Sequence, residues 1–195
     1  MQPYTVIFMG PQGSGKGTQV ELLRSFFQDM SDTPIFHFAT GDGFRSLMKD
    51  DNHTSKIVAE RMHQGVLQPL FLTVWMWGGA FVQSLSGNEH MLIDGYPRTL
   101  LESEVLESAL DFYKKEKVIV IHLQVSDAES IKRMHSRSRE DDHDEAIAKR
   151  LEQYHTLTKP ILEYYKNHDR YHVIDIQGEK SIQDIHQDIQ LYFKQ

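Results

Sequence analysis

The chain has 195 residues, a formal net charge of −7 and no cysteine. A length of this order suits one domain with a substantial core. The acidic balance argues against a general nucleic-acid binder, and the missing thiols exclude disulfides, thiolate zinc sites and cysteine nucleophiles.

Short apolar runs predict the strands of a buried sheet. They lie at residues 6–9, 91–93, 118–123 and 172–176, with 34–38 as a candidate fifth. Continuous runs of this kind suit parallel strands that are covered on both faces.

Amphipathic segments between these runs predict helices at residues 18–28, 102–115, 142–166 and 181–193. Ser181 and Asp184 form a capping-box-like pattern at the last of them. The segment 53–87 is rich in helix-forming patterns without an intervening strand. Strands that alternate with helices predict an α/β fold with a mainly parallel sheet.

No stretch of the sequence has the length of a membrane span. The amino-terminal apolar run is too short for a signal peptide, and Gly78 and Gly79 interrupt the apolar stretch around Trp75. We therefore expect a soluble, cytoplasmic protein, monomeric, whose partners are small molecules rather than nucleic acids or membranes.

A phosphate-binding loop follows the first predicted strand. Residues 10–18 read GPQGSGKGT, and Gly10, Gly15 and Lys16 have the required spacing between a strand and a helix. Glycines let successive backbone N–H groups converge on phosphate oxygens, and the helix start adds a favourable dipole. Gly17 is a departure, because a generic loop of this class has a magnesium-binding hydroxyl there; here the hydroxyl comes at Thr18.

Further motifs follow in a fixed order. ATGDGFR at 39–45 is similar to S/T-T-G-D-x-h-R, GVLQP at 65–69 to G-x-L-V-P, and DGYPRT at 94–99 to D-G-F-P-R-T. Residues 139–165 contain segments similar to R-x-D-D, R-L-x-x-Y and T-x-P-x-x-x-Y-Y. Together with Gly17, this ordered set resembles the adenylate kinase and nucleoside monophosphate kinase family in its short-lid form, over essentially the whole chain.

The resemblance implies a P-loop NTPase-type parallel sheet flanked by helices. It divides the single kinase domain into a core at 1–38, 70–132 and 144–195, a small helical acceptor-binding subdomain at 39–69 and a short lid at 133–143. It implies that ATP phosphorylates a nucleoside monophosphate, with AMP as the first choice and Mg²⁺ as the cofactor. GMP, CMP, UMP or dTMP are alternative acceptors, and a non-kinase nucleotide switch or sensor is a more distant alternative.

The same resemblance, with the chemistry of phosphoryl transfer, predicts the site residues. For ATP they are Gly13, Ser14, Gly15, Lys16, Gly17, Thr18, Arg133, Arg137 and Lys180. For the acceptor they are Thr40, Arg45, Val66, Leu67, Gln68, Gly95, Tyr96, Arg98, Glu102, Arg139 and Arg150. The catalytic set is Lys16, Arg98, Arg137, Arg139 and Arg150, because clustered guanidinium groups suit the charge of the transition state. Asp94 and Asp42 would hold magnesium through water, and no zinc site is expected.

Glu102 departs from the adenylate kinase pattern, which has glutamine four residues after the arginine of D-G-F-P-R-T. An ionised carboxylate only accepts hydrogen bonds, so it leaves N1 of adenine unpaired and would suit guanine better. Alternatively, Glu102 opens the next helix, where a negative charge is favourable, and another group reads the base.

Overall fold

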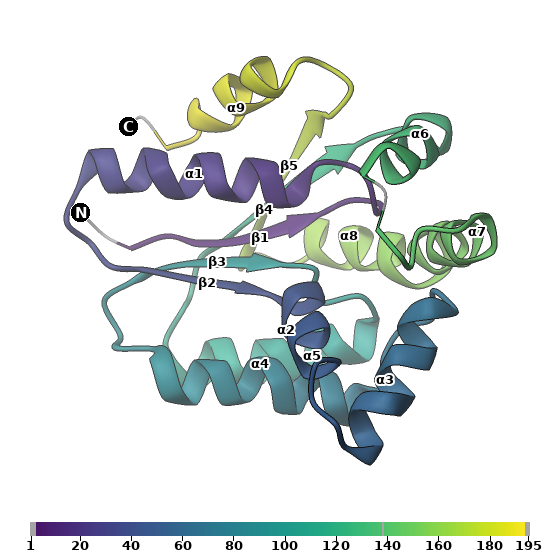
Figure 1. Ribbon diagram of the computed structural model, residues 1–195. Helices are drawn as coiled ribbons and strands as arrows, with labels where there is room; N and C mark the ends of the chain where they lie inside the picture. The colour runs from purple at the N-terminus through teal and green to yellow at the C-terminus, as the bar shows by residue number, and fades with distance from the viewer. Residues whose placement is uncertain (1–2, 138, 194–195) are drawn as a thin grey trace.

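The computed structural model describes residues 3–137 and 139–193. Its centre is a five-stranded sheet with the order β2-β3-β1-β4-β5, and every neighbouring pair is parallel (Figure 1). The strands are β1 (Thr5–Met9), β2 (Ile35–Ala39), β3 (His90–Asp94), β4 (Val118–Gln124) and β5 (Tyr171–Gln177). All five predicted strands and the α/β class are confirmed. Ser138, within the predicted lid, and residues 1–2 and 194–195 of the predicted core lie outside the described residues.

Helices cover both faces of the sheet and its carboxyl end. They are α1 (Lys16–Met30), α2 (Thr40–Leu47), α3 (His53–His63), α4 (Leu70–Ser84), α5 (Leu100–Phe112), α6 (Asp127–Arg137), α7 (Asp144–Gln153), α8 (Lys159–Lys166) and α9 (Ile182–Gln190). The predicted helices are confirmed, although the predicted helix at 142–166 is divided into α7 and α8. The amphipathic pattern did not predict α2 and α6. Within the described residues, no helix combines the length and apolar character that crossing a membrane requires.

Successive side chains of β1 point to opposite faces of the sheet, and each face carries one layer of the core. Val6 and Phe8 are buried against α1 and α9 on one face, and Ile7 and Met9 against α4, α5 and α8 on the other. Each of these side chains is at most 3% exposed. Burial of one such side chain contributes about 1.5–3 kcal/mol, so this central strand anchors both layers.

A π-helical turn, Tyr154–Thr158, separates α7 from α8. Pro160 follows it and has no N–H to donate to the carbonyl of Thr156, so a regular α-helix cannot continue through this point. The turn places Tyr154 next to β4, where its hydroxyl contacts His122 Nε2 at 3.0 Å. His122 is buried and also contacts Asp175 at 2.6 Å, as expected for a packed core histidine.

The strands all end on the same side of the sheet, toward α2, α3, α6 and α7 (Figure 1). In the sheet β1 lies between β3 and β4, and the chain leaves β1 toward β2 on one side but leaves β3 toward β4 on the other, so the loops after β1 and β3 diverge at this point. Ligands of open parallel sheets bind in the crevice that such a divergence creates.

Candidate active site

The loop between β1 and α1 forms the first wall of the site. Gly10 and Gly13 have φ angles of 142° and 85°, which side-chain-bearing residues rarely adopt. A Cβ atom would lie 2.7 Å from the carbonyl oxygen of Leu123 at Gly10 and 2.6 Å from that of Ser130 at Gly13. The loop therefore requires glycine at both positions. Loops of this curled form present backbone N–H groups to anions.

Lys16, the first residue of α1, places its ammonium group inside this loop. Nζ donates to the carbonyl oxygens of Gly10 at 2.9 Å and Pro11 at 2.8 Å, and to Ser14 Oγ at 3.3 Å. Burial lowers the pKa of Lys16 to about 8, and the nearby Asp94 carboxylate opposes this effect. A phosphate group at the loop would favour the charged ammonium and raise the pKa again.

The turn after β3 forms the opposite wall. Asp94 ends the strand, and its Oδ2 lies 3.8 Å from the position that a Cβ atom of Gly17 would take. Thr40, at the start of α2, donates its hydroxyl to the Asp94 carbonyl oxygen at 3.5 Å. The carboxylate therefore faces the start of α1 from the neighbouring strand.

Hydrogen bonds to both the backbone and the side chain of Arg98 hold this residue in the turn. Its N–H donates to Glu102 Oε2 at 2.6 Å, and its carbonyl oxygen accepts from the Thr158 hydroxyl at 2.9 Å. Its Nε donates to the carbonyl oxygen of Gly95 at 2.9 Å. Burial lowers the pKa of Arg98, while Glu102 and Asp94 support its charge.

A buried carboxylate between α6 and α7 binds two arginines. Asp142 accepts from Arg137 Nε at 2.5 Å and Nη2 at 3.0 Å, and from Arg150 Nη1 at 2.5 Å. Arg150 also pairs with Asp141. Burial disfavours the charge of Asp142, but the hydrogen bonds and positive charge of Arg137 and the charge of Arg150 outweigh it, so its pKa is lowered. Asp142 thereby ties the end of α6 to α7.

Replacement of Asp142 by asparagine is expected to destabilise the fold by about 3 kcal/mol at neutral pH, because Arg137 and Arg150 lose a shared counter-charge. Since the folded-state pKa of Asp142 is lowered, its stabilisation is present above the unfolded-state pKa and is lost as the pH falls through the folded-state pKa. Urea unfolding at pH 7 and pH 3 measures both effects, and the difference between wild type and variant should shrink at pH 3. Asp51→Asn, at a carboxylate 90% exposed, is the matched control. Equal stability of Asp142→Asn and wild type at pH 7 would contradict this role.

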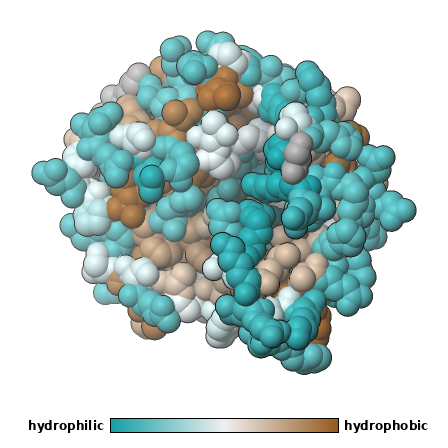
Figure 2. Space-filling model, in the orientation of Figure 1, coloured by the Kyte–Doolittle hydropathy of each residue, from teal (hydrophilic) through white to brown (hydrophobic). Residues whose placement is uncertain are grey.

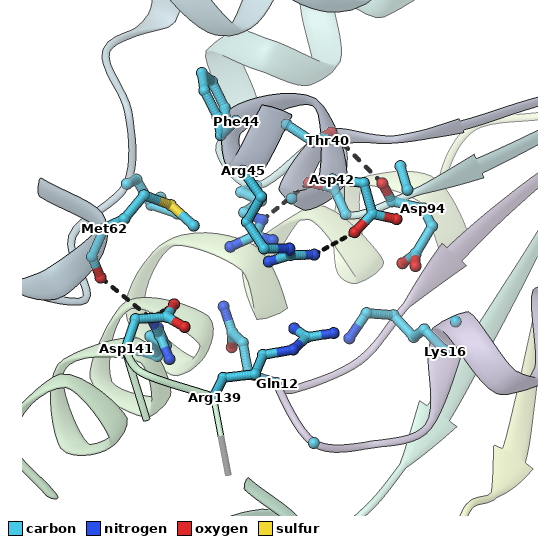
Figure 3. Close-up of a pocket in the computed structure, with 18 of the residues that line it drawn as sticks. Gln12, Lys16, Thr40, Asp42, Phe44, Arg45, Met62, Asp94, Arg139 and Asp141 are labelled. Atoms are coloured by element: carbon cyan, nitrogen blue, oxygen red, sulfur yellow. Dashed lines mark hydrogen bonds and ion pairs between the residues drawn. The ribbon is translucent and has the colours of Figure 1, made fainter. Parts of the chain in front are cut away.

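These walls enclose a cavity of about 550 Å³. In Figure 3, Lys16 and Arg139 extend toward one another from opposite sides, and Arg45 approaches from α2. Figure 2 shows hydrophilic side chains gathered near the middle of this face, over the region of α2, α6 and α7. The concentration of cations at one end suits a ligand with several phosphate groups.

The lining of the cavity also includes apolar side chains. Among them are Phe44, Met62, Val66 and Leu67. Phe44 is buried, and in Figure 3 it lies on α2 beyond Arg45. A cavity lined by both apolar side chains and clustered cations suits a nucleotide, whose base is flat and whose phosphates are charged.

Most of the predicted site residues line this one cavity. They are Gly13, Gly15, Lys16, Gly17, Thr18, Thr40, Asp42, Arg45, Val66, Leu67, Gln68, Asp94, Gly95, Arg98, Glu102, Arg133, Arg137, Arg139 and Arg150. Arg133 lies at the loop, with Nη1 3.4 Å from the Ser14 carbonyl oxygen and Nε bonded to Glu129 at 2.7 Å. Asp42 is engaged in an ion pair with Arg45.

Three predicted residues lie elsewhere. Tyr96 is 1% exposed and packs in the core against Trp77, with its hydroxyl donating to the Glu102 carbonyl oxygen at 2.8 Å. Ser14 is buried inside the loop. Lys180 pairs with Asp188 at 2.7 Å and does not line the cavity. The side chain of Tyr96 is thus structural, because the turn at Pro97 directs it inward.

Several lining residues were not singled out from the sequence. They are Gln12, Ala39, Gly41, Phe44, Met62, Gly65, Thr73 and Asp141. The sequence could have indicated Thr73, because this residue places a hydroxyl on the buried face of an otherwise apolar helix. Ala39, Phe44 and Gly65 lie within the quoted motifs, whereas Met62 carried no signal, since it is indistinguishable from a core residue in the sequence.

Comparison with known proteins points to one family. The family model described as adenylate kinase matches residues 8–170. A relative named adenylate kinase from Corynebacterium urealyticum is 34% identical over 180 residues, which cover 92% of this chain and 93% of the relative. One from Rickettsia africae is 31% identical over 221 residues, covering 97% and 98%, and one from Parabacteroides distasonis is 33% identical over 184 residues, covering 92% of each.

Proposed function

The chain belongs to the adenylate kinase family, and on this premise we propose that it transfers the γ-phosphoryl group of ATP to AMP, giving two molecules of ADP. One observation supports the proposal above the others. The phosphate-binding loop with Lys16 and the turn with Arg98 face each other across one cavity, so donor and acceptor phosphates can meet there. The arginines of α6 and α7 border the same space.

The protein contributes mainly position and charge to this reaction. Lys16 and the loop hold the donor phosphates, and Arg98 holds the acceptor phosphate. Arg137, Arg139 and Arg150 stabilise the negative charge that spreads over the transferred group in the transition state. The acceptor is already an ionised phosphate, so no general base is required. Closure of the lid over these groups would exclude water, which would otherwise accept the phosphoryl group.

The residues present fit a magnesium ion bound together with ATP. Mg²⁺ prefers a few carboxylate contacts, often through water, completed by substrate phosphates. Asp94 offers its carboxylate at the cavity wall beside the start of α1, whereas the carboxylate of Asp42 is engaged by Arg45. When bound, the ion would supply positive charge that offsets the charge of the donor phosphates. Asp94 is thus the better of the two residues to hold its waters.

A two-substrate assay tests the proposed function. We expect ADP to form only when ATP and AMP are both present, in the ratio of two ADP to one AMP consumed. ATP hydrolysis that is independent of a monophosphate would instead indicate a nucleotide switch. Binding of ATP and AMP without turnover would indicate a sensor.

A further inference from the structure

A buried histidine lies near the carboxyl end of β4, on the face of the sheet that α8 covers. His122 is 7% exposed and follows Val118 and Val120 along the same face, both of which are core residues. In the sheet it pairs with Met9 of β1 on one side and with Asp175 of β5 on the other. Met9 directly precedes the phosphate-binding loop, so a polar side chain is buried one strand away from the site.

Both ring nitrogens of His122 have partners. Nδ1 lies 2.6 Å from Asp175 Oδ1, and Nε2 lies 3.0 Å from the hydroxyl of Tyr154. Burial opposes the charge of Asp175, but the hydrogen bond with His122 and the charge of Lys166 outweigh it and lower its pKa. Burial also lowers the pKa of His122, and Asp175 opposes this effect only in part. In a neutral ring beside an ionised carboxylate, Nδ1–H donates to Asp175 and Nε2 accepts from Tyr154.

Tyr154 opens the π-helical turn between α7 and α8. The N–H of Lys159 donates to the Tyr154 carbonyl oxygen and closes this turn. Thr158, the last residue of the turn, is buried and donates its hydroxyl to the Arg98 carbonyl oxygen at 2.9 Å. The turn therefore connects His122 at its first residue with the backbone of Arg98 at its last.

The backbone of Arg98 is bonded on both sides of its Cα atom. Its N–H donates to Glu102 at 2.6 Å, and its carbonyl oxygen accepts from Thr158. The guanidinium extends from this Cα atom, so a shift of Thr158 moves the whole side chain. Misplacement of a binding group by about 1 Å can cost about a hundredfold in rate. The position of the turn thus matters for the direction in which Arg98 points.

We propose that His122 is a positioning residue for Arg98 and acts through the turn that Tyr154 opens. Asp175 orients the imidazole, the imidazole fixes the Tyr154 hydroxyl, and Thr158 transmits the position of the turn to Arg98. The inference rests on the proposed function and adds to it a group that touches neither nucleotide.

Tyr154→Phe tests this connection with a small change, because it removes one hydroxyl and keeps the ring in the core. We expect the Michaelis constant for AMP to rise about three- to tenfold, the effect of one lost hydrogen bond of ordinary strength. The constant for ATP should stay the same, because the loop itself holds Lys16. Thr158→Val removes the bond to Arg98 and should reproduce the same selective rise.

A second arginine-free background shows whether the effect passes through Arg98. In Arg98→Ala, Tyr154→Phe should not raise the constant for AMP further, because the group that the turn positions is gone. In the wild-type background His122→Leu should act like Tyr154→Phe. His122→Gln should recover part of the loss, because its amide oxygen can accept from the Tyr154 hydroxyl.

Tyr171→Phe is the matched control for the loss of a buried tyrosine hydroxyl. Its hydroxyl donates to Glu107 at 3.2 Å and lies at the start of β5, at the opposite end of the sheet. This variant should lower the melting temperature as Tyr154→Phe does, but it should leave both Michaelis constants unchanged.

A purely structural role of His122 predicts the result of the control for Tyr154→Phe as well. An unchanged constant for AMP in Tyr154→Phe, an equal rise of both constants, or an undiminished effect in the Arg98→Ala background would overturn the inference. Absence of AMP phosphorylation by the wild type would instead refute the proposed function itself, and this inference with it.

Discussion

Lys16→Met is expected to lower the rate of phosphoryl transfer about a thousandfold or more, because it removes the cation at the centre of the phosphate-binding loop. In the ligand-free protein the ammonium group is held by the Gly10 and Pro11 carbonyl oxygens and by Ser14. These neutral acceptors bind it less strongly than phosphate would. The charge is thus placed in advance of ATP, and its interaction grows as charge develops on the transferred group.

The variant should remain folded. Methionine has a length similar to that of lysine and fills the same space, and the loop path depends on Gly10 and Gly13 rather than on the ammonium. Circular dichroism and thermal unfolding check the fold, and the two-substrate assay gives the rate. Lys56→Met, at a side chain 72% exposed on α3, is the matched control and should retain full activity. A folded Lys16→Met protein with near-normal turnover would contradict the assignment of the loop.

The parts of the fold that the sequence predicts well are those in which one physical requirement decides the residue. Buried strands require apolar runs, and β1 needs them on both faces because α1 and α4 cover it. The loop needs glycine at Gly10 and Gly13 because of backbone conformation and close approach. Such requirements leave a visible pattern in a single chain.

The sequence pattern did not predict two of the helices, α2 and α6. The sequence of α2 contains Gly41 and Gly43, which disfavour a helix, and contacts with α3 and α4 overcome this preference. The surface of α6 is largely charged, and Ser130 and Met134 are its buried residues. Each segment buries only one apolar residue, Phe44 in α2 and Met134 in α6, so the apolar face is short.

The sequence also did not predict which side chains of the site bind one another. The motif indicated that Arg137 and Arg150 belong near phosphate, but not that both share Asp142 as a counter-ion. Glu102 appeared to conflict with adenine when it was considered alone. The structure shows what the sequence did not, that Oε2 of Glu102 accepts from the Arg98 backbone N–H.

Arg98→Ala is expected to raise the Michaelis constant for AMP roughly 10- to 100-fold, the cost of a lost charge-assisted bond to phosphate. The constant for ATP should change little. The reason is positional: a Cβ atom at Gly95 would lie 3.2 Å from Arg98 Nη2 and 3.8 Å from Thr40, at the α2 side of the cavity. The guanidinium therefore lies beside the turn after β3 and the start of α2, on the side of the cavity proposed for the acceptor.

The truncation should leave the turn intact, which makes the measurement interpretable. The Arg98 backbone remains bonded to Glu102 and Thr158 in the variant, and only the contact with Gly95 is lost. Arg98→Lys keeps the charge but loses the planar fork, so its constant for AMP should fall between those of wild type and Arg98→Ala. Arg24→Ala, at a side chain 45% exposed on α1, is the control for loss of a surface guanidinium. If the constants for ATP and AMP rise equally in Arg98→Ala, the arginine serves both nucleotides, and its assignment to the acceptor phosphate is wrong.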